Sequence, residues 1–290
     1  MNQAVQAASR IRLLGGSVDA VTARGVLRFA GECIRNGRKG IVANHNLHSL
    51  ALSRSDRLMR VFYAMADVIQ IDSTPLIAWG RILGAPLSRD HRCTYLDWRD
   101  DFWRRAQASG WRVFYLGGTP GVAEAAADQL RRRWPGLIIG VQHGYFDHDP
   151  RGAANREVLD TVNAFGADVI FVGLGMPLQE RWIALNYDRL ERGVVFSVGG
   201  AFDYEAGVQV TPPRWTGRLG VEWLFRFISQ PRRLFARYFV EPWSLIGEAR
   251  RDVLGGPVGV RAQPASILKR RIAALASPDL ASADMGVGSL

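Results

Sequence analysis

A carboxylate and two amides in this chain stand where side chains of an α/β protein usually do chemistry. Asp72 ends the apolar run 68–71, and a helix opened by Pro75 follows it. Asn44 and Asn46 end an earlier apolar run. In open α/β sheets, ligands bind beyond the carboxyl ends of the strands. Asp72 is either a helix N-cap, the more common role, or a base that takes a proton from a hydroxyl group; the residues alone favour the cap.

A glycine-rich turn at 117–121 follows another apolar run and leads into a helix. Gly117 and Gly118 let the backbone approach a ligand closely, and a helix N-terminus attracts a diphosphate. The turn lacks the GxGxxG spacing of a dinucleotide site, and no acid follows about 20 residues later to hold a ribose. A tight turn without a ligand explains it about as well.

A second glycine-rich turn, at 172–177, also joins a buried strand to a helix. It contains Gly175, and Gln179 and Glu180 lie in the first turn of the helix. The Gln179 amide is suited to a nucleobase or a sugar hydroxyl. Glu180 has the alternative role of a first-turn acid that the helix dipole favours.

Two further groups are weaker candidates. Arg89, His91 and Arg92 form a compact basic loop that suits phosphate, although a solvated loop explains it too. The sequence 147–149, Asp-His-Asp, resembles the DxD that holds a divalent metal on nucleotide sugars. It stands before Pro150 in a polar stretch, so we expect a turn there. We therefore expect no metal ion at this segment, and the chain offers no other motif that predicts a metal site or a cofactor.

Composition narrows the class of protein. The 290 residues carry a formal charge of +10, and the pI is near 10.4. Such a charge favours anionic partners, which include phospholipid, nucleotide and nucleic acid. Cys33 and Cys93 form no CxxC pair, so a disulfide framework is not expected. The start of the chain lacks the pattern of a signal peptide, and no apolar run approaches the roughly 18 residues of a membrane span. Any membrane contact is expected to be peripheral.

The first 200 residues alternate short β-rich runs with longer helical patterns, which indicates an α/β fold with a mostly parallel sheet and helices around it. The predicted strands are 11–14, 40–43, 68–71, 112–116, 137–141, 169–172 and 194–198. The predicted helices are 22–36, 47–65, 75–83, 95–109, 121–134, 155–165 and 178–187. We expect a catalytic body over 1–210, a helical appendage over 211–252, and a low-complexity tail over 253–290 that is disordered.

The expected appendage combines positive charge with large apolar side chains. Arginines and aromatic residues alternate between 214 and 240, and a break at Gln230-Pro231 predicts two helices. Each cation near an anionic membrane contributes on the order of 1 kcal/mol of binding free energy. An amphipathic helix pair with a solvated arginine face is an equally good explanation. The arginines of the segment are Arg214, Arg218, Arg226, Arg232, Arg233 and Arg237.

Taken in order, these motifs resemble the bacterial glycosyltransferase family named for WecG, TagA and CpsF. The resemblance covers roughly residues 10–245. It is carried by Asn44-x-Asn46, by Asp72, and by four longer runs: GGTPG at 117–121, GLGMPLQERW at 173–182, VGGAFDYEAG at 198–207, and PPRW…VEWLFRFISQPRRLFARYF at 212–239.

The resemblance implies a Rossmann-like body with helices on both faces and a C-terminal membrane-binding appendage. It implies an inverting, metal-independent enzyme that moves a hexose from a UDP-sugar to a polyprenyl-pyrophosphate-linked acceptor at the cytoplasmic face of the plasma membrane. Asp72 matches the family's candidate base, and nucleic acid is not expected as a partner. The substrate-binding residues that it suggests are Asn44, Asn46, Arg89, Arg92, Gly117, Gly118, Gly175, Gln179, Glu180, Arg226, Arg233 and Arg237.

The chain departs from the family pattern near the presumed sugar site. Asn44 stands where threonine is common, Ser73-Thr74 replaces a glycine-rich continuation, and the segment after Arg89 lacks the usual glycine. N-acetylmannosamine, its uronic acid and glucose therefore all stay open as donors, and so does a homo-oligomer. Two other functional classes stay open for this chain. One is an NAD(P)-dependent oxidoreductase on the same scaffold, and the other is a basic membrane or nucleic-acid adaptor.

Overall fold

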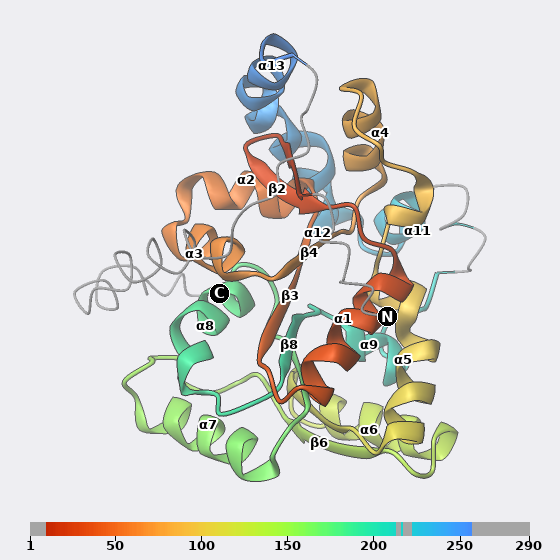
Figure 1. Cartoon of the computed structure of the whole chain (residues 1–290), viewed down its shortest axis with the longest axis vertical. Helices are drawn as coiled ribbons and strands as arrows, with labels where there is room; N and C mark the ends of the chain where they lie inside the picture. Colours follow the sequence, from red (N-terminus) through yellow and green to blue (C-terminus); the bar gives the residue numbers. More distant parts are fainter. Residues whose placement is uncertain (1–9, 213–215, 217–221, 257–290) are drawn as a thin grey trace.

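The structure, a computed structural model, describes residues 10–212, 216 and 222–256. Its centre is a six-stranded sheet in which neighbouring strands are all parallel (Figure 1). The strands are β3 (Gly40–His45), β4 (Val68–Ile71), β5 (Arg112–Gly117), β6 (Ile138–Gln142), β7 (Val169–Gly173) and β8 (Val194–Ser197). Their order across the sheet is β4-β3-β8-β7-β5-β6. The expected α/β fold is confirmed.

Helices cover both faces of this sheet, because successive side chains of a buried strand point to opposite sides and both sides are apolar. One core lies against α1 (Ala23–Arg35), α5 (Tyr95–Ser109), α6 (Val122–Arg133) and α9 (Ala201–Glu205). The other lies against α3 (Arg57–Met65), α7 (Ala153–Phe165) and α8 (Leu178–Asn186). Short 3₁₀ turns, η1 (Arg89–His91) and η2 (Tyr187–Arg189), connect the larger elements.

Most predicted element boundaries are confirmed to within two residues, but the helix expected over 47–65 is two helices. Asp56 separates α2 (Leu47–Ser55) from α3. Its Oδ1 accepts from the backbone N–H of Met59 at 3.0 Å, so it caps the second helix, and its Oδ2 accepts from Arg181 Nε at 2.7 Å. A capping aspartate in the middle of an apolar pattern ends one helix and begins another.

A small third core lies at the β4 edge of the sheet. The strand expected near residue 11 is β1 (Arg10–Leu13), but it pairs antiparallel with β2 (Gly16–Asp19), which the sequence did not predict. Asp19 Oδ2 accepts from the backbone N–H of Ile69 at 2.8 Å and thereby fastens this hairpin to β4. Apolar residues of the hairpin, of α2 and of α4 (Thr74–Ile82) pack together there.

The C-terminal segment, here called the appendage, packs on this third core. It consists of α11 (Glu222–Ser229), α12 (Pro231–Phe235), the π-helical turn η3 (Ala236–Val240), the 3₁₀ turn η4 (Glu241–Leu245) and α13 (Ile246–Leu254). Leu245 is buried in the core, and Asp252 Oδ2 accepts from the backbone N–H of Leu14 at 2.7 Å and from Trp79 Nε1 at 3.0 Å. The predicted break at Gln230 is confirmed. Arg214, Arg218 and the tail 257–290 lie outside the described residues.

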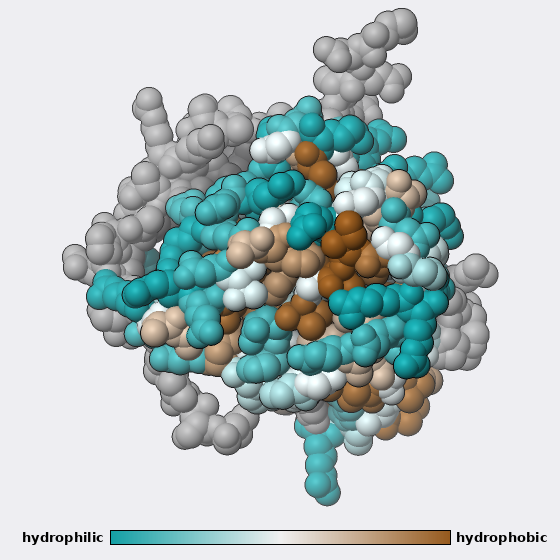
Figure 2. Space-filling model, turned by 90° about the horizontal axis from the view of Figure 1, so that it is seen from below, coloured by the Kyte–Doolittle hydropathy of each residue, from teal (hydrophilic) through white to brown (hydrophobic). Residues whose placement is uncertain are grey.

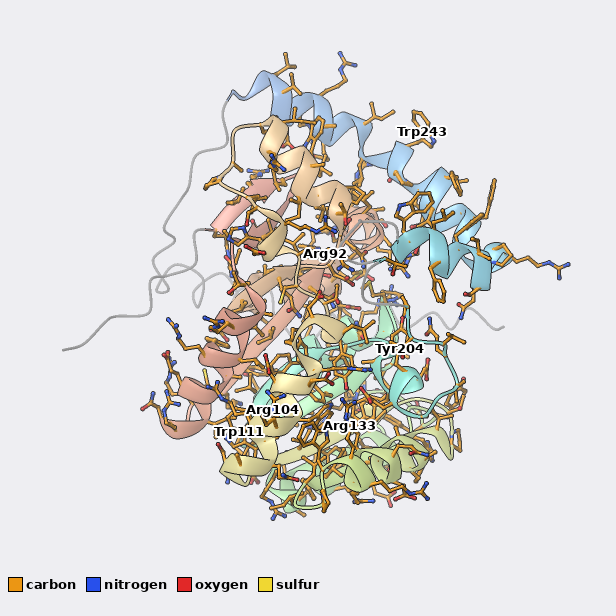
Figure 3. The ribbon with its side chains drawn as sticks, turned by 90° about the vertical axis from the view of Figure 1, so that its right-hand side faces the viewer. Arg92, Arg104, Trp111, Arg133, Tyr204 and Trp243 are labelled. Atoms are coloured by element: carbon orange, nitrogen blue, oxygen red, sulfur yellow. The ribbon has the colours of Figure 1, made fainter. Side chains whose placement is uncertain are left out.

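The appendage carries most of the large apolar side chains that the described residues expose. Trp243, on the outer side of the appendage in Figure 3, is 71% exposed. The others are Trp223, Leu224, Ile228, Phe235, Phe239, Val240, Ile246, Val253 and Leu254. The opposite end of the molecule is mostly hydrophilic, with a small apolar group near its centre (Figure 2). Within residues 10–212 and 222–256, no helix is long and apolar enough to cross a membrane.

Candidate active site

Two adjoining cavities lie between the carboxyl end of the sheet and the appendage. The larger, of about 350 Å³, is bounded by residues that end or follow β3, β4, β7 and β8. The smaller, of about 270 Å³, lies against apolar residues that include Leu47, Trp223, Phe239 and Pro242. Five residues line both cavities, so the two form one cleft: Asn46, His48, Asp72, Arg237 and Tyr238.

Asp72 lies where the two cavities meet. Its backbone N–H donates to the carbonyl of His45 at 2.8 Å and so extends the pairing of β3 with β4 by one residue. The N-cap of α4 is Ser73, not Asp72. Of the two cap residues that the sequence offers, Asp72 and Ser73, the serine holds the N-cap position, and Asp72 lines the cleft instead.

Asn46 has two roles at the start of α2. Its Oδ1 accepts from the backbone N–H of Ser49 at 3.0 Å, and Ser49 Oγ accepts from the Asn46 N–H at 2.9 Å, which is a capping box. Because the carbonyl oxygen is used by the cap, the Nδ2 amide is the donor that Asn46 can offer to a ligand in the cleft.

Four residues that line the large cavity each carry a buried polar atom without a hydrogen-bond partner among the described residues. The atoms are Asn44 Oδ1 on β3, Gln70 Oε1 on β4, Trp98 Nε1 on α5 and Ser197 Oγ on β8. Gln70 is 3% exposed and Trp98 1% exposed. A buried polar atom without a partner costs free energy in a folded protein, so such a group indicates a place for a polar ligand.

The appendage contributes side chains to the cleft. Arg237 and Tyr238, both on η3, line both cavities. The imidazole of His48 contacts the carboxylate of Glu241 on η4, which joins the body to the appendage. Burial, and then the nearby Arg237 cation, lower the pKa of His48, and the contact with Glu241 opposes that shift. The side chains of Arg226 and Arg233 lie outside the described residues.

The structure brings only one of the two predicted loop arginines to the cleft. Arg92 is largely buried, lines the apolar cavity and lies with its Nη1 3.6 Å from Asp97 Oδ2. Figure 3 shows it on the side of the body that faces the appendage. Arg89 is exposed on η1 and lines neither cavity.

Gln179 and Glu180 are fully buried and line neither cavity. Gln179 Nε2 donates to Glu180 Oε1 at 2.7 Å, and Gln179 Oε1 accepts from the backbone N–H of Gly199 at 2.9 Å. Gly199 itself lines the large cavity. The geometry therefore makes Gln179 a support for the cavity wall, rather than the direct ligand of a base or sugar that its sequence position suggested. Burial raises the pKa of Glu180 to about 7.

The two glycine turns also differ in position. Gly175 has a φ of +80° and lines the large cavity. Gly117 and Gly118 line neither cavity; a Cβ on Gly117 would lie 2.4 Å from the carbonyl oxygen of Gly173, so close packing of β5 on β7 requires glycine there. The N–H of Gly121 donates to Glu124 Oε2 at 3.0 Å, which places an acid at the N-terminus of α6 instead of a phosphate.

Several residues that line the cleft were not predicted from the sequence. Asp203 and Tyr204 belong to the VGGAFDYEAG run, whose short helix α9 was not predicted, and both line the large cavity. Figure 3 marks the position of Tyr204. His48 has no motif. Gln70 carried a weak signal, because an amide inside a four-residue apolar strand is unusual.

The Asp-His-Asp segment forms the expected turn. Asp147 Oδ1 accepts from the Asp149 N–H at 3.0 Å, and Asp149 Oδ1 accepts from the Arg151 N–H at 2.9 Å. Among the described side chains, no group of three or more His, Cys, Asp or Glu residues is placed to hold a metal ion.

Comparison with known proteins identifies the family. The model of the glycosyl transferase WecG/TagA/CpsF family matches residues 11–257. The chain belongs to this family. The match spans the body, both cavities and the described part of the appendage, so the cleft just described is the cleft of a WecG/TagA/CpsF protein.

The chain is also similar to named proteins of Staphylococcus aureus. The N-acetylglucosaminyldiphosphoundecaprenol N-acetyl-beta-D-mannosaminyltransferases of Staphylococcus aureus strains MW2 and NCTC 8325 are each 31% identical to it over 169 residues. The match covers 58% of this chain and 64% of each relative.

Proposed function

We propose that this WecG/TagA/CpsF protein is an inverting, metal-independent hexosyltransferase. It moves a sugar from a UDP-sugar to a polyprenyl-pyrophosphate-linked saccharide in the synthesis of a cell-surface polysaccharide. One observation carries the proposal: Asp72 stands where a polar cavity at the end of the sheet meets an apolar cavity under the appendage. A donor in the first cavity and a lipid-linked acceptor in the second would meet at this carboxylate.

The proposed reaction is a single displacement. The Asp72 carboxylate takes the proton of the acceptor hydroxyl, whose oxygen attacks the anomeric carbon from the face opposite the diphosphate. The bond between that carbon and the diphosphate oxygen breaks, and its electron pair leaves with UDP, so the anomeric configuration inverts. A positioned general base contributes typically 10²–10⁴-fold to such a rate.

Negative charge grows on the departing diphosphate, and cations of the chain are suited to stabilise it. Arg237 lines both cavities and Arg92 lines the apolar one. Gly175 allows the backbone to approach the donor, and the Nδ2 amide of Asn46 orients it. Arg226 and Arg233 precede Arg237 on the appendage, and we assign them to the phosphates of donor or acceptor.

The appendage is proposed to hold the acceptor lipid and the membrane surface. Its exposed Trp243, Phe239 and Ile246 would enter the boundary between headgroups and acyl chains, and its arginines would contact anionic lipid. The contact is peripheral, at the cytoplasmic face of the plasma membrane. The names of the two staphylococcal relatives favour N-acetylmannosamine as the sugar and N-acetylglucosaminyl-diphosphoundecaprenol as the acceptor, ahead of N-acetylmannosaminuronic acid or glucose.

A direct assay tests the proposal. The full chain is incubated in EDTA with that acceptor and with the UDP derivative of each of the three sugars. We expect transfer from at least one donor, and an inverted anomeric configuration in the product by NMR. Retention of configuration would contradict the displacement at Asp72, and strict dependence on a divalent metal would contradict the role given to the arginines.

A further inference from the structure

Asn44, Gln70 and Trp98 lie on one side of the sheet. Asn44 and Gln70 are register partners on the neighbouring strands β3 and β4, so their side chains project from the same face. Trp98 packs in the core of that face, together with Val42 and Val68 of the same two strands. All three residues line the large cavity, and each carries a buried polar atom with no partner among the described residues.

The chemistry of these atoms defines what can satisfy them. Asn44 Nδ2 donates to the carbonyl of Ser197 at 3.2 Å, which fixes Asn44 Oδ1 as an acceptor. Gln70 Oε1 is a second acceptor, and the indole Nε1 of Trp98 is a donor only. A ligand that pairs with all three atoms carries both O–H or N–H donors and an acceptor oxygen within a few ångströms, as neighbouring hydroxyl or acetamido groups of a sugar do.

The charged residues around the cavity point to the same class of ligand. Among the described residues that line it, Asp72, Asp203 and Glu241 are acids, and the basic side chains are Arg237 and His48, the latter in contact with Glu241. If Arg237 binds the diphosphate, a carboxylate on the sugar would face acids. If C6 of the sugar faces Asn44 Oδ1 and Gln70 Oε1, a carboxylate there would also offer these acceptors no proton.

We propose that Gln70 and Trp98, with Asn44, form the subsite that binds the transferred sugar and selects a neutral hexose or N-acetylhexosamine over a hexuronic acid. The inference rests on the proposed function and adds two specificity-determining residues to it. A site built to hydrogen-bond a substrate group discriminates strongly, because a poor substrate leaves its buried polar atoms unpaired.

The test compares donors and variants of the full chain. Wild-type kcat/KM is measured with UDP-N-acetylmannosamine, UDP-glucose and UDP-N-acetylmannosaminuronic acid, and we expect at least about a 100-fold preference for the better neutral donor over the uronate. Gln70→Met removes the whole side-chain amide with little change in length, and Trp98→Phe removes the indole N–H together with one ring; each should lower kcat/KM for that neutral donor roughly 5- to 100-fold. The Kd of UDP alone should change less than about twofold, because UDP lacks the sugar that these residues contact.

Two matched variants control for packing. Trp111→Phe changes a buried tryptophan just beyond the opposite end of α5, and Gln142→Met changes a glutamine at the carboxyl end of β6; neither residue lines the cavity. Equal or better use of the uronate by the wild-type chain would overturn the subsite without any substitution. So would Gln70 and Trp98 variants that match their controls, and in both cases the proposed transfer would still stand. Failure of the wild type with all three donors would overturn the proposed function and the subsite together.

Discussion

His48, at the start of α2, contacts Glu241 in the appendage, and both side chains line the large cavity. The pair joins residues 193 positions apart, one in the body and one in the appendage. It therefore couples the position of η3, which carries Arg237, to the body of the enzyme.

Substitution of Glu241 tests the contact between His48 and Glu241. Glu241→Gln should loosen the appendage, because it removes the charged partner of a half-buried histidine, an effect of about 1 kcal/mol. Hydrogen exchange of the backbone amides in 222–245 should become roughly fivefold faster, while that in α5 and α6 stays unchanged. Glu191→Gln, at an exposed acid of the body, is the control. Unchanged exchange in the appendage would show that the contact does not hold it.

Asp72→Asn tests the base. The amide keeps the shape of the side chain but cannot take a proton at neutral pH, so kcat should fall by about 10²–10⁴-fold. UDP affinity and melting temperature should stay close to those of the wild type. Asp90→Asn, at an exposed acid of η1, should have no effect on kcat. A kcat for Asp72→Asn within threefold of the wild type would remove Asp72 from the mechanism.

Alanine substitutions of Arg237 and Arg232 distinguish a role in catalysis from a role in membrane attraction. Each variant, Arg237→Ala or Arg232→Ala, removes one cation of the appendage, so each should weaken sedimentation with anionic vesicles to a similar extent, on the order of 1 kcal/mol. Only Arg237 lines the cleft, whereas Arg232 is exposed. We expect kcat/KM to fall about 10²–10³-fold for Arg237→Ala alone. Equal losses of activity in the two variants, assayed with a short-chain acceptor in the absence of vesicles, would contradict a role of Arg237 at the diphosphate.

Glu180 should make stability depend on pH. Burial raises its pKa from 4.5 to about 7, so the folded state binds a proton that the unfolded state has released over this range. The stabilising contribution is full below pH 4.5 and is lost as pH rises towards 7, with a total of about 3 kcal/mol. Between pH 4.5 and pH 7, the free energy of unfolding of the wild type should therefore fall by this amount relative to that of Glu180→Gln.

Urea unfolding of both proteins at several pH values measures that difference, in which the contributions of other groups cancel. Glu157→Gln, at an exposed acid of α7, serves as the control and should follow the wild type at every pH. Parallel curves for the wild type and Glu180→Gln would mean that Glu180 ionises as readily in the folded chain as in the unfolded one.

The order of the helices and strands could be predicted from the sequence, because each element depends mainly on residues close together along the chain. The strands β4 and β7 and the helices α6 and α7 depend on neighbours in sequence, and all were predicted closely. The strand β2 was missed, because Asp19 fastens it to Ile69, far away along the chain. The split at Asp56 was missed because a local cap interrupts an apolar pattern that runs through both helices.

The sequence by itself determined the α/β class, the family, the basic appendage and the set of motifs at strand ends, because residue types, periodicity and ordered motifs carry that information. Only the tertiary structure decided which motif residues share the cleft. It brought Asp72, Asn46 and Arg237 together, buried Gln179 and Glu180 beneath the wall, and placed Gln70 beside Asn44. The physical reason is that register and burial are set by packing between segments distant in sequence, and neither can be read from the residues on one segment.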